Sequence, residues 1–400
     1  MRGQTGNRHR HVKPPVSVVI PTRDNIATID ACLASVRSQE WDNLEIIVVN
    51  DGSIDGTELR CARHVADDAR VHLFHLAHSE GAATARNVGL SHAKGEFVAF
   101  IDGDIHADPD WLALLLAPIL ADDADCTGGP DVVPPTDPLI ARCVGHSMDS
   151  FLVTAGLRHG RTRLVKYLPG TGNMAVRRSV LESVGAFNPA FHDSGEDKEL
   201  LYRVRDGGFR IRYVEEARVW HHRTTSLVAY ARKMYLSGVR RVDIWRSLRG
   251  TLEFAHVVPA VLLVGALSLV ACAFRGGEET VRLTVLVTTT GLFLLAVDGV
   301  WAACRLRALR AAAIVPLTSL LVVLGYGLGI CAALLSVYPS VAFSRMRASR
   351  TNPDGRSADH AFAISPAPAC IGKPLRHDSA TQLHLPSTDF PGIAGHTNAG

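Results

Sequence analysis

The chain has 400 residues, of which 47% are hydrophobic and 20% charged, so we expect at least two structural units. Its formal net charge of +3 is too small to indicate a nucleic-acid-binding protein. The eight cysteines are scattered without a Cys-x-x-Cys pair, which argues against a disulfide framework or zinc site and favours a cytosolic catalytic part.

From residue 15 to about 220, short apolar runs alternate with helical patterns. Strands are predicted at 15–20, 45–49, 71–76 and 97–101, and helices at about 29–36, 57–65 and 81–92. This alternation indicates an α/β fold with a mostly parallel sheet and helices on its faces. Ligands of such sheets bind beyond the carboxyl ends of the strands. Four acids follow strand ends here: Asp24, Asp51, Asp102 and Asp104.

The run at 97–101 ends in Asp102-Gly103-Asp104, two carboxylates one residue apart. Such acids repel each other and resist desolvation unless a cation lies between them. Their oxygens suit Mg²⁺ or Mn²⁺, ions that usually hold a substrate diphosphate as well. We expect Asp104 to be the main metal ligand and Asp102 to contact the metal or a ribose, although an Asp-Gly turn also explains the pattern.

Three other residues are candidates for contact with a nucleotide, and each has a simpler explanation. Asp51 could accept hydrogen bonds from a ribose or base, or only form an Asp-Gly-Ser turn. Asp24 has the same ambiguity and could instead cap the following helix. Arg86 could reach the nucleotide from the helix at 81–92, but a single helical arginine is more often solvated.

Glu196 and Asp197 open a helical pattern further along the chain. An acidic first turn that opposes the helix dipole is one reading, and a general base for an acceptor hydroxyl is the other. Only one of two adjacent helical residues would point into a cleft, and we favour Asp197 over Glu196.

Two further motifs complete the set of candidates. The glycines of Gly170-Thr171-Gly172-Asn173 permit close approach to a donor sugar or acceptor, or form a plain turn. His221 or His222 follows a probable strand and could complete the metal shell, although a pair of surface histidines is an equally good explanation.

The chemistry of the chain changes after about residue 250. Three apolar runs at 257–274, 283–304 and 311–337 are each long enough to span a hydrocarbon core of about 30 Å. Three in succession favour membrane helices over buried soluble ones. Asp298 interrupts the second run and needs a polar partner or a place near an interface.

The arginines give conflicting signs about topology. By the positive-inside rule, those at 240–249 and 305–310 are cytoplasmic and the loop at 275–282 lies outside. A third complete span would place Arg345, Arg347 and Arg350 outside, against the same rule. We expect three spans and an outer tail, although Pro316 and nearby glycines would let the last run bend or re-enter.

In their order, the motifs resemble the family 2 glycosyltransferases, which have the GT-A nucleotide-sugar fold; they lie at 16–24, 46–57, 81–90, 95–104, 170–178 and 195–203. The resemblance implies that Asp104 binds metal and that Asp197 is the catalytic base. It also implies a nucleotide pocket lined by Pro21, Asp24, Asp51, Arg86 and Asp102. Asp24 departs from the pattern, since many relatives have Glu there.

The stretch 223–241 is similar to membrane-associated enzymes of bacterial exopolysaccharide assembly, of the succinoglycan type. In those enzymes a basic amphipathic segment leads into carboxy-terminal membrane helices. The chain lacks the Gln-x-x-Arg-Trp motif of processive synthases, which favours transfer of a single sugar.

These features predict an inverting, metal-dependent transfer from a nucleotide-diphosphate sugar to a lipid-linked or saccharide acceptor at the cytoplasmic face of the inner membrane. The context would be cell-surface polysaccharide or glycolipid synthesis, with polysaccharide-assembly proteins as partners. The alternative is an inactive nucleotide-binding scaffold or transporter component. The expected parts are a disordered N-terminus (1–14), a GT-A domain (15–225), a basic juxtamembrane segment (226–254), a transmembrane region (255–343) and a disordered tail (344–400).

Overall fold

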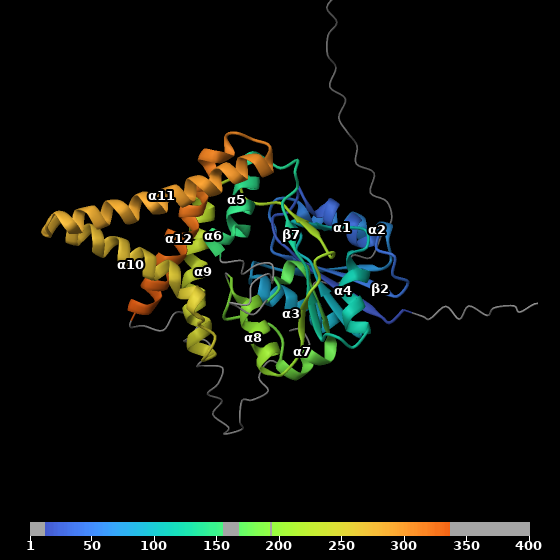
Figure 1. Cartoon of the computed structure of the whole chain (residues 1–400). Coiled ribbons are helices and arrows are strands. Elements are labelled where there is room, and N and C mark those ends of the chain that lie inside the picture. The colour runs from blue at the N-terminus through green and yellow to red at the C-terminus, as the bar shows by residue number, and fades with distance from the viewer. Residues whose placement is uncertain (1–12, 155–167, 193, 337–400) are drawn as a thin grey trace, which may run out of the picture.

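The computed structural model describes residues 13–154, 168–192 and 194–336 (Figure 1). The expected disordered segments 1–14 and 344–400 lie outside the described residues, apart from residues 13 and 14. The last part of the expected transmembrane region, 337–343, lies outside them too.

A seven-stranded mixed sheet forms the centre of the first part of the chain, in the order β3-β2-β1-β4-β8-β6-β9. Its first four strands pair in parallel: β1 (Val16–Thr22), β2 (Leu44–Asp51), β3 (Val71–Leu76) and β4 (Phe97–Phe100). These are the four strands predicted from the sequence. Three short strands extend the sheet: β8 (Met174–Arg177), antiparallel to both neighbours, β6 (Cys126–Gly128) and β9 (Ile211–Tyr213).

Helices cover both faces of this sheet and enclose two hydrophobic cores (Figure 1). One core contains residues of α1 (Ile29–Arg37), α2 (Thr57–Asp67) and α4 (Trp111–Leu120). The other contains residues of α3 (Ala82–His92), α7 (Arg178–Val184) and α8 (Glu196–Asp206). The strands β1, β2 and β4 are buried along both faces, as expected of a sheet between two helical layers.

A second, three-stranded sheet lies at the carboxyl edge of the first. It consists of β5 (Ile105–Ala107), β10 (Val219–His221) and β7 (Asp131–Val132), with β10 in the middle. β10 pairs antiparallel with β5, which places His221 opposite Ile105. This pairing brings a histidine from late in the chain next to the loop that carries Asp102 and Asp104.

The remaining elements of the described chain are helical. The turn η1 (Thr171–Asn173) precedes β8, and two helices, α5 (Leu139–Asp149) and α6 (Phe151–Thr154), follow β7. After β10 come α9 (Leu227–Ser247) and three long apolar helices, α10 (Phe254–Arg275), α11 (Glu278–Leu306) and α12 (Ala311–Leu335). Each of the last three is long and apolar enough to cross a membrane. α10 and α11 project from the body as an arm (Figure 1).

Candidate active site

Asp102 and Asp104 lie just beyond β4, between the two sheets. Asp102 accepts a hydrogen bond of 2.6 Å from Arg86 Nη2, and Asp104 Oδ2 lies 3.3 Å from His221 Nε2. Gly172 of η1 closes over the same place, because a Cβ there would lie 3.0 Å from Asp102 Oδ2. The two acids therefore have different partners, which suits the different roles predicted for them.

Arg86 is buried and joins two acids that are far apart in the sequence. Its side chain is 3% exposed, and Nη1 donates to Glu196 Oε1 at 2.7 Å while Nη2 donates to Asp102. Burial alone would lower the pKa of Arg86, but the charges of Asp102 and Glu196 hold it above its usual value. The solvated alternative for Arg86 is therefore wrong.

The structure distinguishes Glu196 from Asp197 at the start of α8. Glu196 points inward to Arg86; burial raises its pKa, and the arginine charge opposes that shift. Asp197 stays about one-fifth exposed, and its Oδ1 accepts from the backbone N–H of Lys198 at 2.7 Å. Because Glu196 is already held by Arg86, Asp197 is the acid of this pair that remains accessible to an acceptor.

Asp104 and His221 form a pair suited to a divalent cation. Burial alone would raise the pKa of Asp104, but His221, with the charges of Lys233 and Arg223, holds it below its ordinary value. The aspartate is therefore ionised at neutral pH. His221 Nδ1 faces Asp131 Oδ2 at 3.3 Å on its other side, which leaves Nε2 directed at Asp104.

A carboxylate and an imidazole nitrogen directed at one point are a donor set that Mg²⁺ or Mn²⁺ accepts. Within the described parts of the chain no group of three His, Cys, Asp or Glu side chains gathers in metal-binding geometry. The residues present fit a cation that takes its remaining ligands from a diphosphate and water. His222 pairs instead with Asp137 at 2.8 Å, so His221 is the better candidate of the two histidines.

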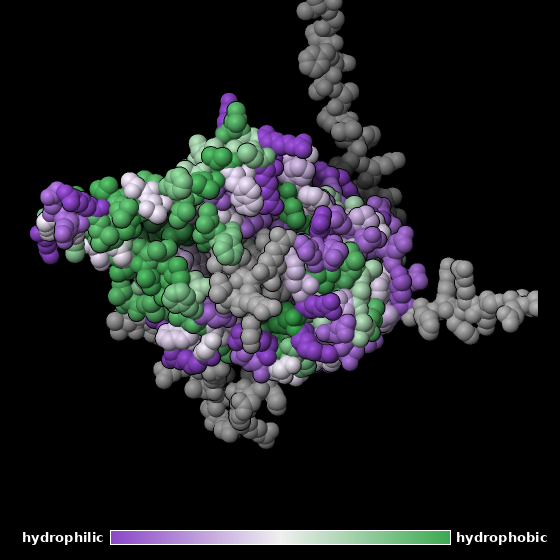
Figure 2. Space-filling view, viewed as in Figure 1, coloured by the Kyte–Doolittle hydropathy of each residue, from purple (hydrophilic) through white to green (hydrophobic). Residues whose placement is uncertain are grey.

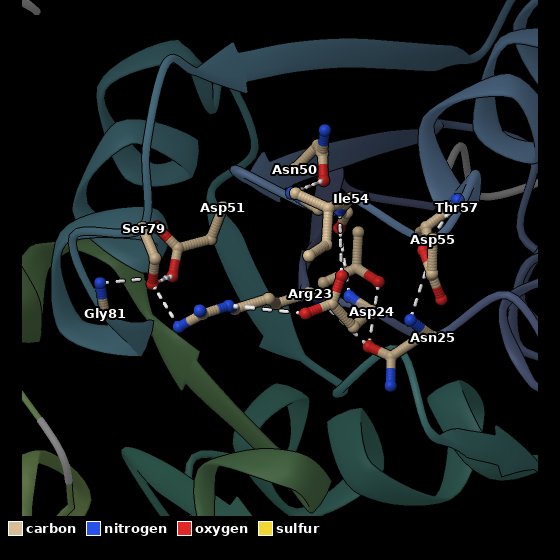
Figure 3. Close-up of polar contacts among 12 residues, drawn as sticks. Arg23, Asp24, Asn25, Asn50, Asp51, Ile54, Asp55, Thr57, Ser79 and Gly81 are labelled. Carbon is tan, nitrogen blue, oxygen red and sulfur yellow. Dashed lines mark hydrogen bonds and ion pairs between the residues drawn. The ribbon is translucent and has the colours of Figure 1, made fainter.

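Asp51 and Asp24 hold the loops around the carboxyl ends of β1 and β2 (Figure 3). Asp51 accepts from Ser79 Oγ at 2.8 Å and from the backbone N–H groups of Glu80 and Gly81 at 2.7 and 3.1 Å. Asp24 accepts from the N–H of Ile54 at 2.9 Å.

Asp24 adopts a φ of +50°, which non-glycine residues rarely do. It does not cap α1, whose N-cap residue is Thr28, so that alternative is wrong. Pro21 is buried in β1, and its carbonyl accepts from the N–H of Gly103 at 3.2 Å. Contacts of Pro21, Asp24 and Asp51 with a nucleotide stay predictions.

Within 170–173, the residues have separate tasks. Asn173 is buried: its Nδ2 donates to the carbonyls of Pro130 and Ala217 at 3.0 and 2.8 Å, and its Oδ1 accepts from Trp111 Nε1 at 2.8 Å. These bonds fix the η1 turn. Thr171 is buried too, whereas the described residues leave open space where a Cβ at Gly170 would point.

Sequence reasoning missed two residues that support His221. Arg223 Nη2 donates to Asp131 Oδ2 at 2.5 Å, and the same carboxylate oxygen faces His221. Arg223 adjoins the histidine pair in the sequence, and that position was the available signal. Asp131 lies about 90 residues earlier and had no signal of its own.

Comparisons with known proteins show what the chain is similar to. Residues 17–185 match the family described as glycosyl transferase family 2. The pre-mycofactocin glycosyltransferase of Mycobacterium tuberculosis (strain CDC 1551 / Oshkosh) is 31% identical over 316 residues, which cover 73% of this chain and 65% of that protein. The chain thus spans slightly less than two thirds of this relative's length.

Two other similarities extend beyond the matched family region. Glycosyltransferase AglE of Haloferax volcanii is 26% identical over 257 residues, or 64% of this chain and 82% of the relative. The solved structure of the mannosyltransferase PcManGT from Pyrobaculum calidifontis, in complex with GDP-Man and Mn²⁺, superposes with a TM-score of 0.55 at 21% identity, over 76% of this chain and 87% of that one. Residues 17–185 are therefore similar to family 2 glycosyltransferases, and the chain has the GT-A fold followed by three apolar helices long enough to cross a membrane.

Proposed function

We propose that this protein is an inverting glycosyltransferase that moves one sugar from a nucleotide-diphosphate sugar to an acceptor at a membrane surface. The observation that carries the proposal is the meeting of Asp102, Asp104 and His221 at one sheet edge, with Arg86 linking Asp102 to the helix of Asp197. A structural role alone does not require an ionised, partly exposed carboxylate beside an imidazole at this edge.

On the donor side, Asp104 and His221 would hold a Mg²⁺ or Mn²⁺ ion. When bound, the ion would neutralise charge that builds on the leaving diphosphate. Asp102, fixed by Arg86, would accept from a ribose hydroxyl, and the loops held by Asp24 and Asp51 would border the base. The Mn²⁺ in the mannosyltransferase neighbour supports a divalent metal here.

On the acceptor side, Asp197 would take the proton from the acceptor hydroxyl. The hydroxyl oxygen then forms a bond to the anomeric carbon as the bond from that carbon to the diphosphate oxygen breaks, so the configuration inverts. The backbone N–H of Lys198 fixes Oδ1 of Asp197, and Lys198 Nζ lies 3.6 Å from Oδ2, the oxygen that would take the proton. Gly170 and Gly172 would let the donor sugar approach the backbone.

The acceptor in this proposal is a lipid-linked or free saccharide on the cytoplasmic face of the inner membrane. The proximity of the apolar helices to the site supports it: Arg241 of α9 donates to Tyr202 of α8 and to Tyr326 of α12 at 3.0 and 3.3 Å. We propose a role in cell-surface polysaccharide or glycolipid synthesis, of the succinoglycan type, together with polysaccharide-assembly proteins.

The experiment is a screen of the purified full-length protein against a panel of nucleotide sugars, with release of nucleoside diphosphate as the readout. We expect one donor to be turned over with Mg²⁺ or Mn²⁺, and turnover to stop with a chelator and return when metal is restored. Donor binding without diphosphate release, in the presence of membrane lipid extracts as acceptor, would instead support the inactive scaffold.

A further inference from the structure

The three apolar helices differ in how they pack. In the most apolar stretch of each helix, only 6% of α10 and 11% of α11 is buried, against 39% of α12. α10 and α11 lie side by side as an antiparallel arm, and α12 runs across the base of that arm (Figure 1). Only the arm has the exposure expected of helices that lipid surrounds.

Contacts along the helices show how steeply α12 crosses. Thr284 of α11 donates to the Leu269 carbonyl of α10 at 3.2 Å. Counted from this contact along the two antiparallel helices, residue 299 of α11 is level with residue 254 of α10. A Cβ at Gly299 would lie 2.5 Å from the Ala312 carbonyl of α12, and one at Gly327 would lie 2.7 Å from the Pro259 carbonyl of α10.

Between Ala312 and Gly327, α12 advances by about 22 Å at the helical rise of 1.5 Å per residue. The two contact points on the arm, at the levels of residues 254 and 259 of α10, are only about 8 Å apart along the arm axis. A helix parallel to the arm would have moved as far along it as along its own axis. α12 therefore lies across the arm.

A buried polar cluster fixes the level at which the arm leaves the catalytic body. Asp298 of α11 accepts from Ser150 Oγ at 2.9 Å and lies 3.3 Å from His146 Nε2 and 3.4 Å from Ser319 Oγ. His146 is on α5, Ser150 directly follows it, and both belong to the catalytic part of the chain. Because these partners belong to the part that carries the site, we place the Asp298 level outside the hydrocarbon layer, which accounts for an acid in an otherwise apolar helix.

The arm beyond this level has the length of one hydrocarbon core. From Glu278 to Val297, α11 rises about 30 Å, and the paired part of α10 rises as far. Exposed apolar side chains line it, including Leu262 and Leu267 on α10 and Leu286 on α11. Figure 2 shows this as a green arm with a purple tip. The ends of the helices at that tip carry Arg275, Glu278, Glu279 and Arg282.

α12 has one side against protein and one side exposed. Its buried side packs on α5 and α9, where Arg246 donates to the Ala333 carbonyl at 2.6 Å and Ser147 shares a 2.6 Å hydrogen bond with Thr318. Its other side exposes an apolar stripe at helical spacing, namely Leu317, Leu320, Leu328 and Leu335. α12 therefore offers lipid one apolar side only, whereas α10 and α11 are exposed along most of their surface.

We propose that only α10 and α11 cross the bilayer, and that α12 lies in the membrane interface on the side of the catalytic domain. The apolar stripe of α12 then faces lipid, and the chain leaves α12 at Ser336 on the catalytic side. Two crossings resolve the conflict in the sequence, because Arg345, Arg347 and Arg350 then join the other arginine clusters on one side of the membrane.

The test is epitope accessibility in sealed membrane vesicles made from cells that express the full chain. One tag is placed at a time before residue 1, after Gly277, after Leu309 or after residue 400. We expect antibody to reach the tags at 1, 309 and 400 from one side of the membrane and the tag at 277 from the opposite side. All four tags should react after permeabilisation.

Two results would overturn the proposal. If the tag at residue 400 is accessible from the same side as the tag at 277, and from the side opposite to the tag at residue 1, then α12 crosses the membrane. If the tag at 277 is accessible from the same side as the tag at residue 1, then the arm does not cross the membrane. If insertion after Gly277 prevents membrane assembly, a Gly277→Lys variant is labelled with an impermeant amine reagent, and the label on the peptide that contains residue 277 gives the same answer; that glycine has open space around its Cβ position.

Discussion

At the scale of single residues, Arg86 shows what a sequence reveals and what it hides. The paired acids at 102 and 104 were predicted as a site, because they end a buried strand without a folding reason. Arg86 was only one candidate among solvated arginines, since its second partner, Glu196, is 110 residues away. The same holds for Asp131, whose importance appears only once β10 has placed His221 beside it.

Asp104→Asn should abolish metal-dependent turnover of the donor and leave the fold intact. The amide keeps the size of the side chain but removes the negative charge that holds the cation. Diphosphate release should fall at least about 100-fold, which is typical of removing an essential electrostatic group. The matched control is Asp110→Asn, an exposed acid at the N-cap of α4 without a side-chain capping bond. Near-normal metal-dependent turnover by Asp104→Asn would show that the metal site is assigned to the wrong residue.

Asp197→Asn should reduce kcat by about 10²–10⁴-fold while donor affinity changes little, because a positioned base contributes that much and the nucleotide contacts lie elsewhere. Glu196→Gln should act differently, since it weakens the buried contact that orients Arg86. We expect that variant to raise the donor KM and lower the unfolding temperature. Steady-state kinetics with both variants decide the matter: a larger kcat loss in Glu196→Gln would reverse the choice of base.

At the scale of elements, the sequence predicted the long regular pieces, and of the short ones it indicated only the strand residues that precede the histidine pair. The strands β1 to β4 have the β-branched runs and turn residues that define a strand locally. β5, β7 and β10 are two or three residues long and exist through their pairing with one another. α5 was also missed. Its buried side faces α9, α11 and α12, so its place depends on helices about 90 or more residues later.

Gly238→Ala should destabilise the contact between α9 and α12. A Cβ at position 238 would lie 2.2 Å from the Tyr326 carbonyl, so the two helices would have to separate. Overpacking of this kind costs about 1–3 kcal/mol, against a gain of about 1 kcal/mol in helix propensity. Gly291→Ala in α11 gains the same propensity in open space. The unfolding temperature in detergent should therefore fall for Gly238→Ala and stay level or rise for Gly291→Ala. Equal shifts of the two unfolding temperatures would mean that α9 and α12 do not approach this closely.

At the scale of the whole molecule, the catalytic body and the apolar arm are one connected structure. α5 contacts α11 and α12 through the Asp298 cluster, and Arg142 of α5 donates to the Leu306 carbonyl at the end of α11 at 2.6 Å. The sequence predicted the three apolar helices from composition alone. It did not predict their arrangement, because hydropathy reports how apolar a helix is and not what lies against it.

Leu286→Lys and Leu320→Lys test the depth of the two helices with the same substitution. Leu286 lies near the middle of the arm, where a lysine costs about 2.5–3.5 kcal/mol on insertion scales, so the membrane-integrated fraction should fall strongly. Leu320 lies on the exposed stripe of α12, where a lysine can extend to the headgroups, and integration should change little. Carbonate extraction of expressing membranes measures both, and equal losses would place α12 as deep as the arm.

The bridge made by Arg86 also has a kinetic consequence. One guanidinium holds Asp102, on the donor side, and Glu196, the neighbour of the proposed base. A donor that draws Asp102 into a new position changes the restraint on the first turn of α8, and linkage requires the effect to be reciprocal. We therefore expect ordered addition, with the nucleotide sugar first and the acceptor second, and a donor affinity that acceptor analogues increase. Replacing Arg86 with lysine, which cannot grip both carboxylates through a planar fork, should make the order of addition random.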